Sequence, residues 1–220
     1  MRTRLARSLL VSCLSLLPAV ALAGPPLLCF PMVVGDAPSL PWGTGGWNSS
    51  DPNYDVSRLA DDTTALLGPA VPTLVRMETL RRAALYAAKD AAAAGRLFAA
   101  LRARVSKGGT GPSDALARFD LGYAVEAFRQ TTHMGGTVRS AAEPAEDGYA
   151  LITQTLAVRG RDPAMEYAAA LVTMGGAARA VSGEHLRRAG AGAAPGSDLA
   201  RTMAAHRELW GDRLVAANRP

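Results

Sequence analysis

Three charged residues that could carry chemistry stand close together in the chain, at Arg76, Glu78 and Arg81. They lie in a stretch whose apolar residues recur every three or four positions, as on one face of a helix. Glu78 therefore reaches positions 81 and 82 at the spacings that allow ion pairs along a helix. If acids from neighbouring helices faced these arginines, the group could bind a ligand or act in general acid–base catalysis. We favour the simpler interpretation, in which interhelical ion pairs fix the packing and the other charges face solvent.

Acids for such a group stand on later predicted helices. Asp120 and Glu126 belong to a helix expected over residues 113–132, and Tyr123 lies on the same segment. Glu166, farther along the chain, is a third acid that could face the same arginines. The candidate site would therefore be assembled between helices rather than within one motif.

Two tryptophans near the N-terminus could line a surface for carbohydrate or peptide. Trp42 and Trp47 stand in a segment rich in proline and glycine. Packing against the helical body is the favoured interpretation, because tryptophan is usually mostly buried. The candidate binding residues are Arg76, Glu78, Arg81, Asp120, Tyr123, Glu126, Trp42 and Trp47.

The chain lacks the motifs of common metal sites and of nucleophilic enzymes. His133, His185 and His206 are scattered, and none has the partner spacing that a zinc or di-iron site uses. His206 shares a predicted helix face with Trp210, which favours a half-buried histidine over a ligand. The sequence therefore predicts no metal site and no cofactor. A metal carrier that uses His133 and Met134 is a weaker alternative.

The first 23 residues have the pattern of a secretory signal peptide. Three arginines precede an apolar run, and Ala21-Leu22-Ala23 forms a small-residue cleavage site. Cleavage near Ala23 would export the chain to the periplasm or the medium and leave 197 of its 220 residues. Membrane contact is then expected only through this segment, before its removal. An uncleaved N-terminal anchor is the alternative.

The charge balance argues against nucleic acid as a partner. The whole chain has a net charge of +5, but the predicted leader contains three of its arginines and no acid. The remaining 21 basic and 19 acidic residues give a net charge of only +2. Nucleic-acid binding usually requires a clustered basic surface. A protein or a peptide is the expected partner.

Residues 24–56 are expected to form an extended arm, because prolines and glycines interrupt every helical period there. From residue 57 onward the spacing of apolar residues is helical. Helices are expected over residues 57–67, 73–105 with a break near Lys89-Asp90, 113–132, 145–159, 163–174, 177–188 and 197–211. Residues 189–196 have the composition of a linker.

These patterns predict a single all-α domain over residues 57–220, built of about six or seven helices in antiparallel hairpins. No segment alternates apolar and polar residues as a half-buried strand requires. Without a catalytic motif, the predicted function is that of an exported, non-catalytic binding or interaction module. Two alternatives are an enzyme with an Arg/Glu/Asp site between helices and a carrier of a small ligand or metal.

Overall fold

The computed structural model describes residues 26–107, 111–132, 144–174 and 179–210. Within these ranges the chain forms eight α-helices, one 3-10 helix and no β-strand beyond an isolated bridge between Trp42 and Ser50. The predicted all-α class is confirmed, and the predicted number of helices was slightly too low.

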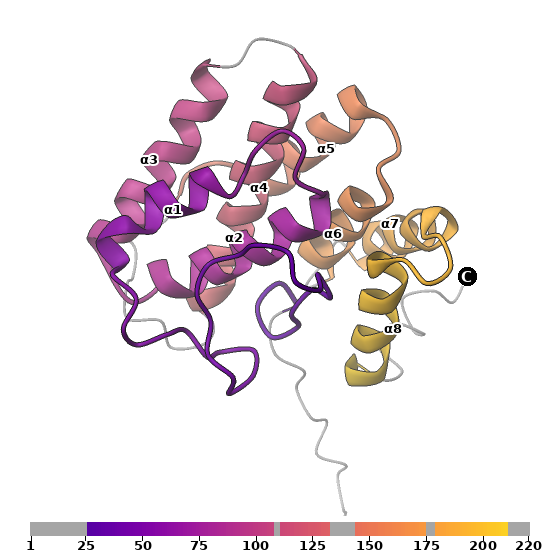
Figure 1. The fold of residues 1–220 in the computed structure, drawn as a ribbon. Coiled ribbons are helices and arrows are strands. Elements are labelled where there is room, and N and C mark those ends of the chain that lie inside the picture. The colour runs from indigo at the N-terminus through magenta and orange to yellow at the C-terminus, as the bar shows by residue number, and fades with distance from the viewer. Residues whose placement is uncertain (1–25, 108–110, 133–143, 175–178, 211–220) are drawn as a thin grey trace, which may run out of the picture.

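The elements, in chain order, are η1 (Val56–Arg58), α1 (Leu59–Ala65), α2 (Thr73–Ala87), α3 (Ala91–Lys107), α4 (Pro112–Thr132), α5 (Gly148–Arg159), α6 (Pro163–Thr173), α7 (Arg179–Gly192) and α8 (Asp198–Trp210). The most extensive contacts join helices adjacent in the chain, α4 with α5 and α6 with α7. Helix α2 packs chiefly against α4, and α3 packs against α1 and α4. Figure 1 shows α2 inside the body, with α3 on one side and α6 to α8 on the other.

Aspartates define several helix starts. The side chain of Asp162 accepts backbone N–H bonds from Ala164 and Met165, and Pro163 occupies the first turn of α6, as predicted. The break between α2 and α3 is also confirmed, because Asp90 accepts from the N–H of Ala93 at 2.8 Å. Such caps satisfy donors that the first helical turn cannot pair internally.

Helix α2 is buried on nearly every side. Of its 15 residues, 14 are buried, including three with full charges. The expected single apolar stripe with charges facing solvent is therefore wrong for this helix. The reason is tertiary: α4 covers one face and the segment before α1 covers another, and both supply polar partners for the buried charges.

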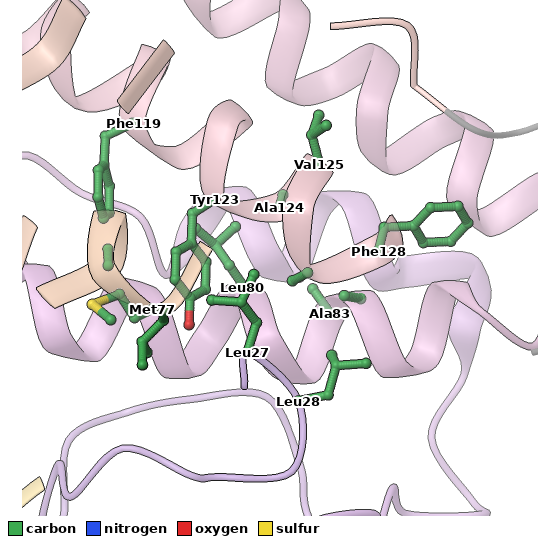
Figure 2. Packing of buried hydrophobic residues seen from close by; sticks show 14 of the residues in the cluster. Leu27, Leu28, Met77, Leu80, Ala83, Phe119, Tyr123, Ala124, Val125 and Phe128 are labelled. Atoms are coloured by element: carbon green, nitrogen blue, oxygen red, sulfur yellow. The ribbon is translucent and has the colours of Figure 1, made fainter. Parts of the chain in front are cut away.

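The apolar core forms where α2 meets α4. Leu80 and Ala83 of α2 lie against Tyr123 and Ala124 of α4, and Leu27 reaches the same region from the N-terminal segment (Figure 2). All five side chains are at most 1% exposed. Burying apolar side chains to this degree contributes about 25 cal/mol per Å² removed from water.

Helix α7 extends further than the sequence indicated. It continues to Gly192, so the first half of the predicted linker over residues 189–196 is helical. Ala189 is fully buried, and Gly192 lies so close to Pro163 that a Cβ there would stand 2.4 Å from its Cγ. Tertiary packing against α6 thus overrides the low helix propensity of this glycine-rich stretch.

The glycine within α4 marks a close helix crossing, as its position inside an apolar helix suggested. A Cβ on Gly122 would lie 2.6 Å from the carbonyl oxygen of Gly148 and 2.9 Å from Cβ of Leu151. The backbones of α4 and α5 therefore approach each other through two facing glycines.

Replacing Gly122 with alanine is expected to destabilise the protein by about 1–3 kcal/mol, because overpacking outweighs the gain in helix propensity. Gly95→Ala is the matched control, since Gly95 also lies within a helix but has open space at the Cβ position. This control should be stabilised by about 0.5–1 kcal/mol. Urea unfolding measures the stability change of both variants, and equal stabilisation of the two would show that the helix crossing at Gly122 is not tight.

Candidate functional site

The first charged group predicted from the sequence is a fully buried interhelical ion pair. Arg76 of α2 donates through Nη1 to both carboxylate oxygens of Asp120 of α4, at 3.0 and 2.7 Å. Arg104 of α3 donates to Oδ2 of the same carboxylate at 2.9 Å. Burial raises the pKa of Asp120, and the two guanidinium groups oppose that shift. One carboxylate thereby joins three helices.

The same two arginines also hold the turn that precedes α2. Arg76 Nε donates to the carbonyl of Val71 at 3.1 Å, and Arg104 Nη2 donates to the carbonyl of Leu67 at 2.7 Å. A further donor of Arg76 reaches the carbonyl of Gly68. These arginine donors are therefore committed to internal acceptors.

The second charged group is the predicted cluster on α2. Glu78 accepts from Nε and Nη2 of Arg81 and from Nε of Arg82, each at 2.8 Å. The predicted i+3 and i+4 ion pairs are thus confirmed. Their expected exposure is wrong for Glu78 and Arg81, whose side chains are 1% and 0% exposed.

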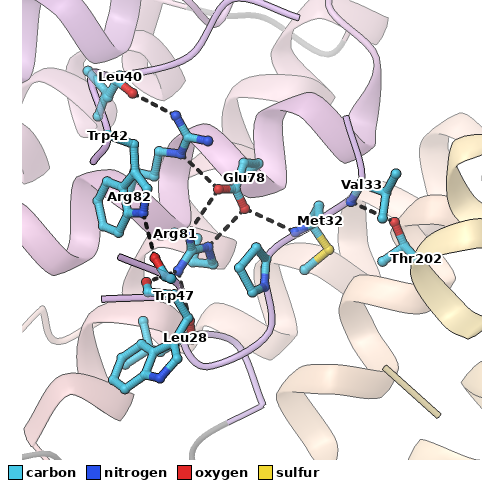
Figure 3. A network of polar contacts seen from close by, with 12 residues as sticks. Leu28, Met32, Val33, Leu40, Trp42, Trp47, Glu78, Arg81, Arg82 and Thr202 are labelled. Atoms are coloured by element: carbon cyan, nitrogen blue, oxygen red, sulfur yellow. Dashed lines mark hydrogen bonds and ion pairs between the residues drawn. The ribbon is translucent and has the colours of Figure 1, made fainter. Parts of the chain in front are cut away.

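This cluster fastens the N-terminal strap, defined here as residues 26–50 (Figure 3). Glu78 Oε2 accepts from the N–H of Met32 at 3.1 Å. Arg81 Nη1 donates to the carbonyls of Leu28 and Trp47, both at 2.8 Å. Arg82 Nη1 donates to the carbonyl of Leu40 at 2.7 Å. The three charged side chains therefore supply hydrogen-bond partners to backbone groups of an irregular segment that has no regular backbone pairing of its own.

The strap also bonds to α8. The hydroxyl of Thr202 accepts from the N–H of Val33 at 2.9 Å. His206 is buried, and its Nε2 donates to the carbonyl of Pro31 at 3.0 Å while its Nδ1 accepts from the hydroxyl of Tyr167 at 2.6 Å. The predicted structural role of this histidine is confirmed, and burial lowers its pKa.

The two candidate tryptophans are half-buried and lie on the strap. The guanidinium carbons of Arg81 and Arg82 stand 5.1 and 5.4 Å from the ring centre of Trp42, within the range of cation–π attraction. Trp42 also packs edge-on against Tyr86. Trp47 offers its carbonyl to Arg81. Both residues therefore take part in covering α2.

Glu126 and Tyr123 lie on α4 but do not share a site. Glu126 Oε1 binds Nη1 of Arg129 at 2.8 Å and accepts from the N–H of Gly148 at 3.0 Å, where α5 begins. Tyr123 is fully buried, its hydroxyl has no hydrogen-bond partner among the described residues, and burial raises its pKa. The structure thus brings Arg76 to Asp120 and Glu78 to Arg81, and leaves Glu126 apart from both.

The pKa of Glu78 yields a testable pH dependence. Burial alone would raise it, but the hydrogen bonds and charges of Arg81 and Arg82 outweigh burial and hold it below the ordinary value of 4.5. A carboxylate with a lowered folded-state pKa stabilises the fold above the unfolded pKa, and this stability is lost as the pH falls through the folded pKa.

We therefore expect the free energy of unfolding to fall as the pH drops below about 4.5. Glu78→Gln should show a smaller dependence over the same window, because it no longer exchanges that proton. Urea unfolding at a series of pH values measures both slopes. If the free energy of unfolding of Glu78→Gln changed with pH as steeply as that of the wild type, Glu78 would not be the source of this pH dependence.

A third polar cluster was not anticipated. His185 of α7 contacts Glu166 Oε2 of α6 through Nδ1 at 2.5 Å and the hydroxyl of Tyr149 of α5 through Nε2 at 3.0 Å. Because a carboxylate only accepts, Nδ1 carries a proton and donates to Glu166, while Nε2 shares a hydrogen bond with the tyrosine hydroxyl. The expectation that Glu166 faces Arg76 or Arg81 is wrong, since α7 packs against α6 and supplies the partners of this carboxylate instead.

Beside this cluster lies an arginine-lined hollow between α6 and α7. Its volume is about 440 Å³, and its lining consists of Arg161, Pro163, Glu166, Arg187, Arg188, Ala191 and Gly192. Arg188 pairs with Glu184 and lies 3.8 Å from Glu166 Oε1. Within the described residues, Arg161 and Arg187 are exposed and have no ion-pair partner. The one feature of the sequence that could have pointed to this hollow is the pair of adjacent arginines at positions 187 and 188.

Comparisons with protein-family models, with curated proteins and with solved structures found no match to this chain. In the described ranges, no three His, Cys, Asp or Glu side chains are placed so that they could hold a metal ion together. His133 and Met134 of the carrier hypothesis lie outside those ranges. No described helix is long and apolar enough to cross a membrane.

Proposed function

We propose that this chain is an exported, non-catalytic binding module whose partner is a protein or a peptide. The observation that carries the proposal is the contrast between two sets of arginines. Three arginines of α2 and α3, at positions 76, 81 and 104, donate to internal backbone carbonyls. Arg161 and Arg187 instead face an open hollow without a partner among the described residues. A binding site uses charged groups that the fold leaves unpaired.

Two observations favour binding over catalysis at this hollow. Tyr149 and His185 form a hydrogen-bonded line with Glu166, but neither of them lines the hollow. Burial also raises the pKa of Tyr149, which keeps the phenol protonated and weakens it as a nucleophile. The line is better suited to fixing the position of Glu166 than to attacking a substrate.

Export is supported by the leader pattern over residues 1–23. Leu27 and Leu28 follow the predicted cleavage site closely and are fully buried, so the proposed mature chain retains the residues that complete the core. Mass spectrometry of the protein isolated from outside the cytoplasm tests this part of the proposal. A mass that includes the first 23 residues would contradict it.

Selection of peptides from a random displayed library on the chain 24–220 tests the proposed function. We expect enrichment of a defined set of peptides that bind reversibly in solution. A failure to enrich any peptide would contradict the proposal that the chain is a binding module. Turnover of chromogenic ester, phosphate or glycoside substrates that His185→Ala abolishes would instead support the enzyme alternative.

A further inference from the structure

We infer that the hollow between α6 and α7 binds an acidic peptide segment, with Arg161 and Arg187 as the groups that take its carboxylates. The inference rests on the proposed function and specifies its ligand class. The hollow has the size of small-ligand sites, which occupy about 300–1,000 Å³, and its volume is about 440 Å³.

The charge of the lining selects an anion. Three guanidinium groups and one carboxylate line the hollow, so positive charge exceeds negative charge there. Guanidinium groups bind carboxylates through two parallel N–H bonds, which is the strongest and most directional contact available to either group. Clusters of arginine recognise acidic motifs in many binding proteins.

The frame of the hollow is built from fixed residues. Gly192 of α7 approaches Pro163 so closely that no side chain fits between them, and both residues line the hollow. Glu166 is 5% exposed and is oriented by His185, which Tyr149 holds in turn. A rigid frame lowers the entropic cost of binding, because fewer groups must be ordered by the ligand.

The position of Glu166 favours a peptide over a polyanion. Its Oε2 is used by His185, but among the described residues Oε1 has only the 3.8 Å contact with Arg188 and can accept a hydrogen bond. A peptide supplies backbone N–H donors for this oxygen beside its own carboxylates. The phosphodiester groups of a nucleic-acid backbone have no N–H or O–H donor for this oxygen, and their negative charge is repelled by Glu166.

Fluorescence polarisation with the labelled peptide Gly-Glu-Asp-Glu-Asp-Gly tests the inference on the chain 24–220. The amide peptide Gly-Gln-Asn-Gln-Asn-Gly has nearly the same shape without the side-chain charges. We expect the acidic peptide to bind at least about tenfold more tightly than the amide peptide, and the Arg161→Ala/Arg187→Ala double variant to lose about tenfold or more of that affinity. Arg207→Ala, at an exposed position on α8 that does not line the hollow, should bind as the wild type does.

The outcomes separate the inference from the proposed function. If library peptides bind but the acidic peptide does not, the assigned ligand class is wrong and the proposed binding function is retained. If the double variant keeps its affinity for the acidic peptide while circular dichroism shows it folded, the assigned site is wrong and the inference fails. If no peptide binds, the proposed function fails as well. Displacement of the bound peptide by inorganic phosphate or a six-base DNA at concentrations as low as those of unlabelled peptide would overturn the choice of a peptide.

Discussion

Asp120→Ala is expected to lower the free energy of unfolding by about 3–5 kcal/mol, because it leaves buried positive charge without its counterion. Arg76 has no exposed side-chain surface, and Asp120 binds it through both carboxylate oxygens. Arg104 loses the same partner. The variant also loses the link between α2, α3 and α4, so the cost is not limited to one contact.

Urea unfolding followed by circular dichroism measures this loss. Asp198→Ala is the matched control, since Asp198 pairs with Arg201 on the surface and both side chains are about half exposed. Surface pairs contribute about 0–1 kcal/mol, so the control should change little. A loss at Asp120 no larger than that at Asp198 would show that the buried pair does not organise the helices.

Arg81→Ala is expected to have a comparable effect, about 3–5 kcal/mol, by a different route. It removes the main partner of buried Glu78 and the donors to the carbonyls of Leu28 and Trp47. It also removes packing of the arginine stem and its contact with Trp42. The N-terminal strap, residues 26–50, should therefore loosen before the helices unfold.

Amide hydrogen exchange resolves this local effect from the global one. In Arg81→Ala, we expect amide exchange to accelerate, relative to the wild type, more at residues 28–47 than in α4. Arg82→Ala is the adjacent control, because Arg82 is partly exposed and bonds a single strap carbonyl, that of Leu40. Uniform acceleration along the whole chain, or equal effects of the two variants, would contradict the fastening role of Arg81.

The part of the site that lies within one helix could be predicted from residue spacing. The distance from Glu78 to positions 81 and 82 follows from helix geometry alone, and the ion pairs are present. Asp120 was one of three acids that the sequence offered as a partner for Arg76 or Arg81, and the structure pairs it with Arg76. The burial of Glu78 and Arg81 could not be predicted, because the N-terminal strap that covers them has an irregular backbone without a periodic sequence pattern.

The polar cluster beside the hollow could not be predicted for a related reason. Glu166, His185 and Tyr149 meet only because α5, α6 and α7 pack together, and their separations of 19 and 36 residues follow no local rule. The glycine-rich end of α7 also resembled a linker. In the structure Gly192 packs tightly against Pro163 of α6, a contact that a local pattern does not contain.

If the α2 charges hold the fold and the α6–α7 hollow meets the partner, NMR chemical-shift mapping of the chain 24–220 during titration with the acidic peptide should separate the two regions. We expect the shift changes to concentrate at residues 161–166 and 187–192, with little change at Arg76, Glu78 and Arg81. Shifts concentrated on α2 and the strap, with residues 187–192 unaffected, would contradict it.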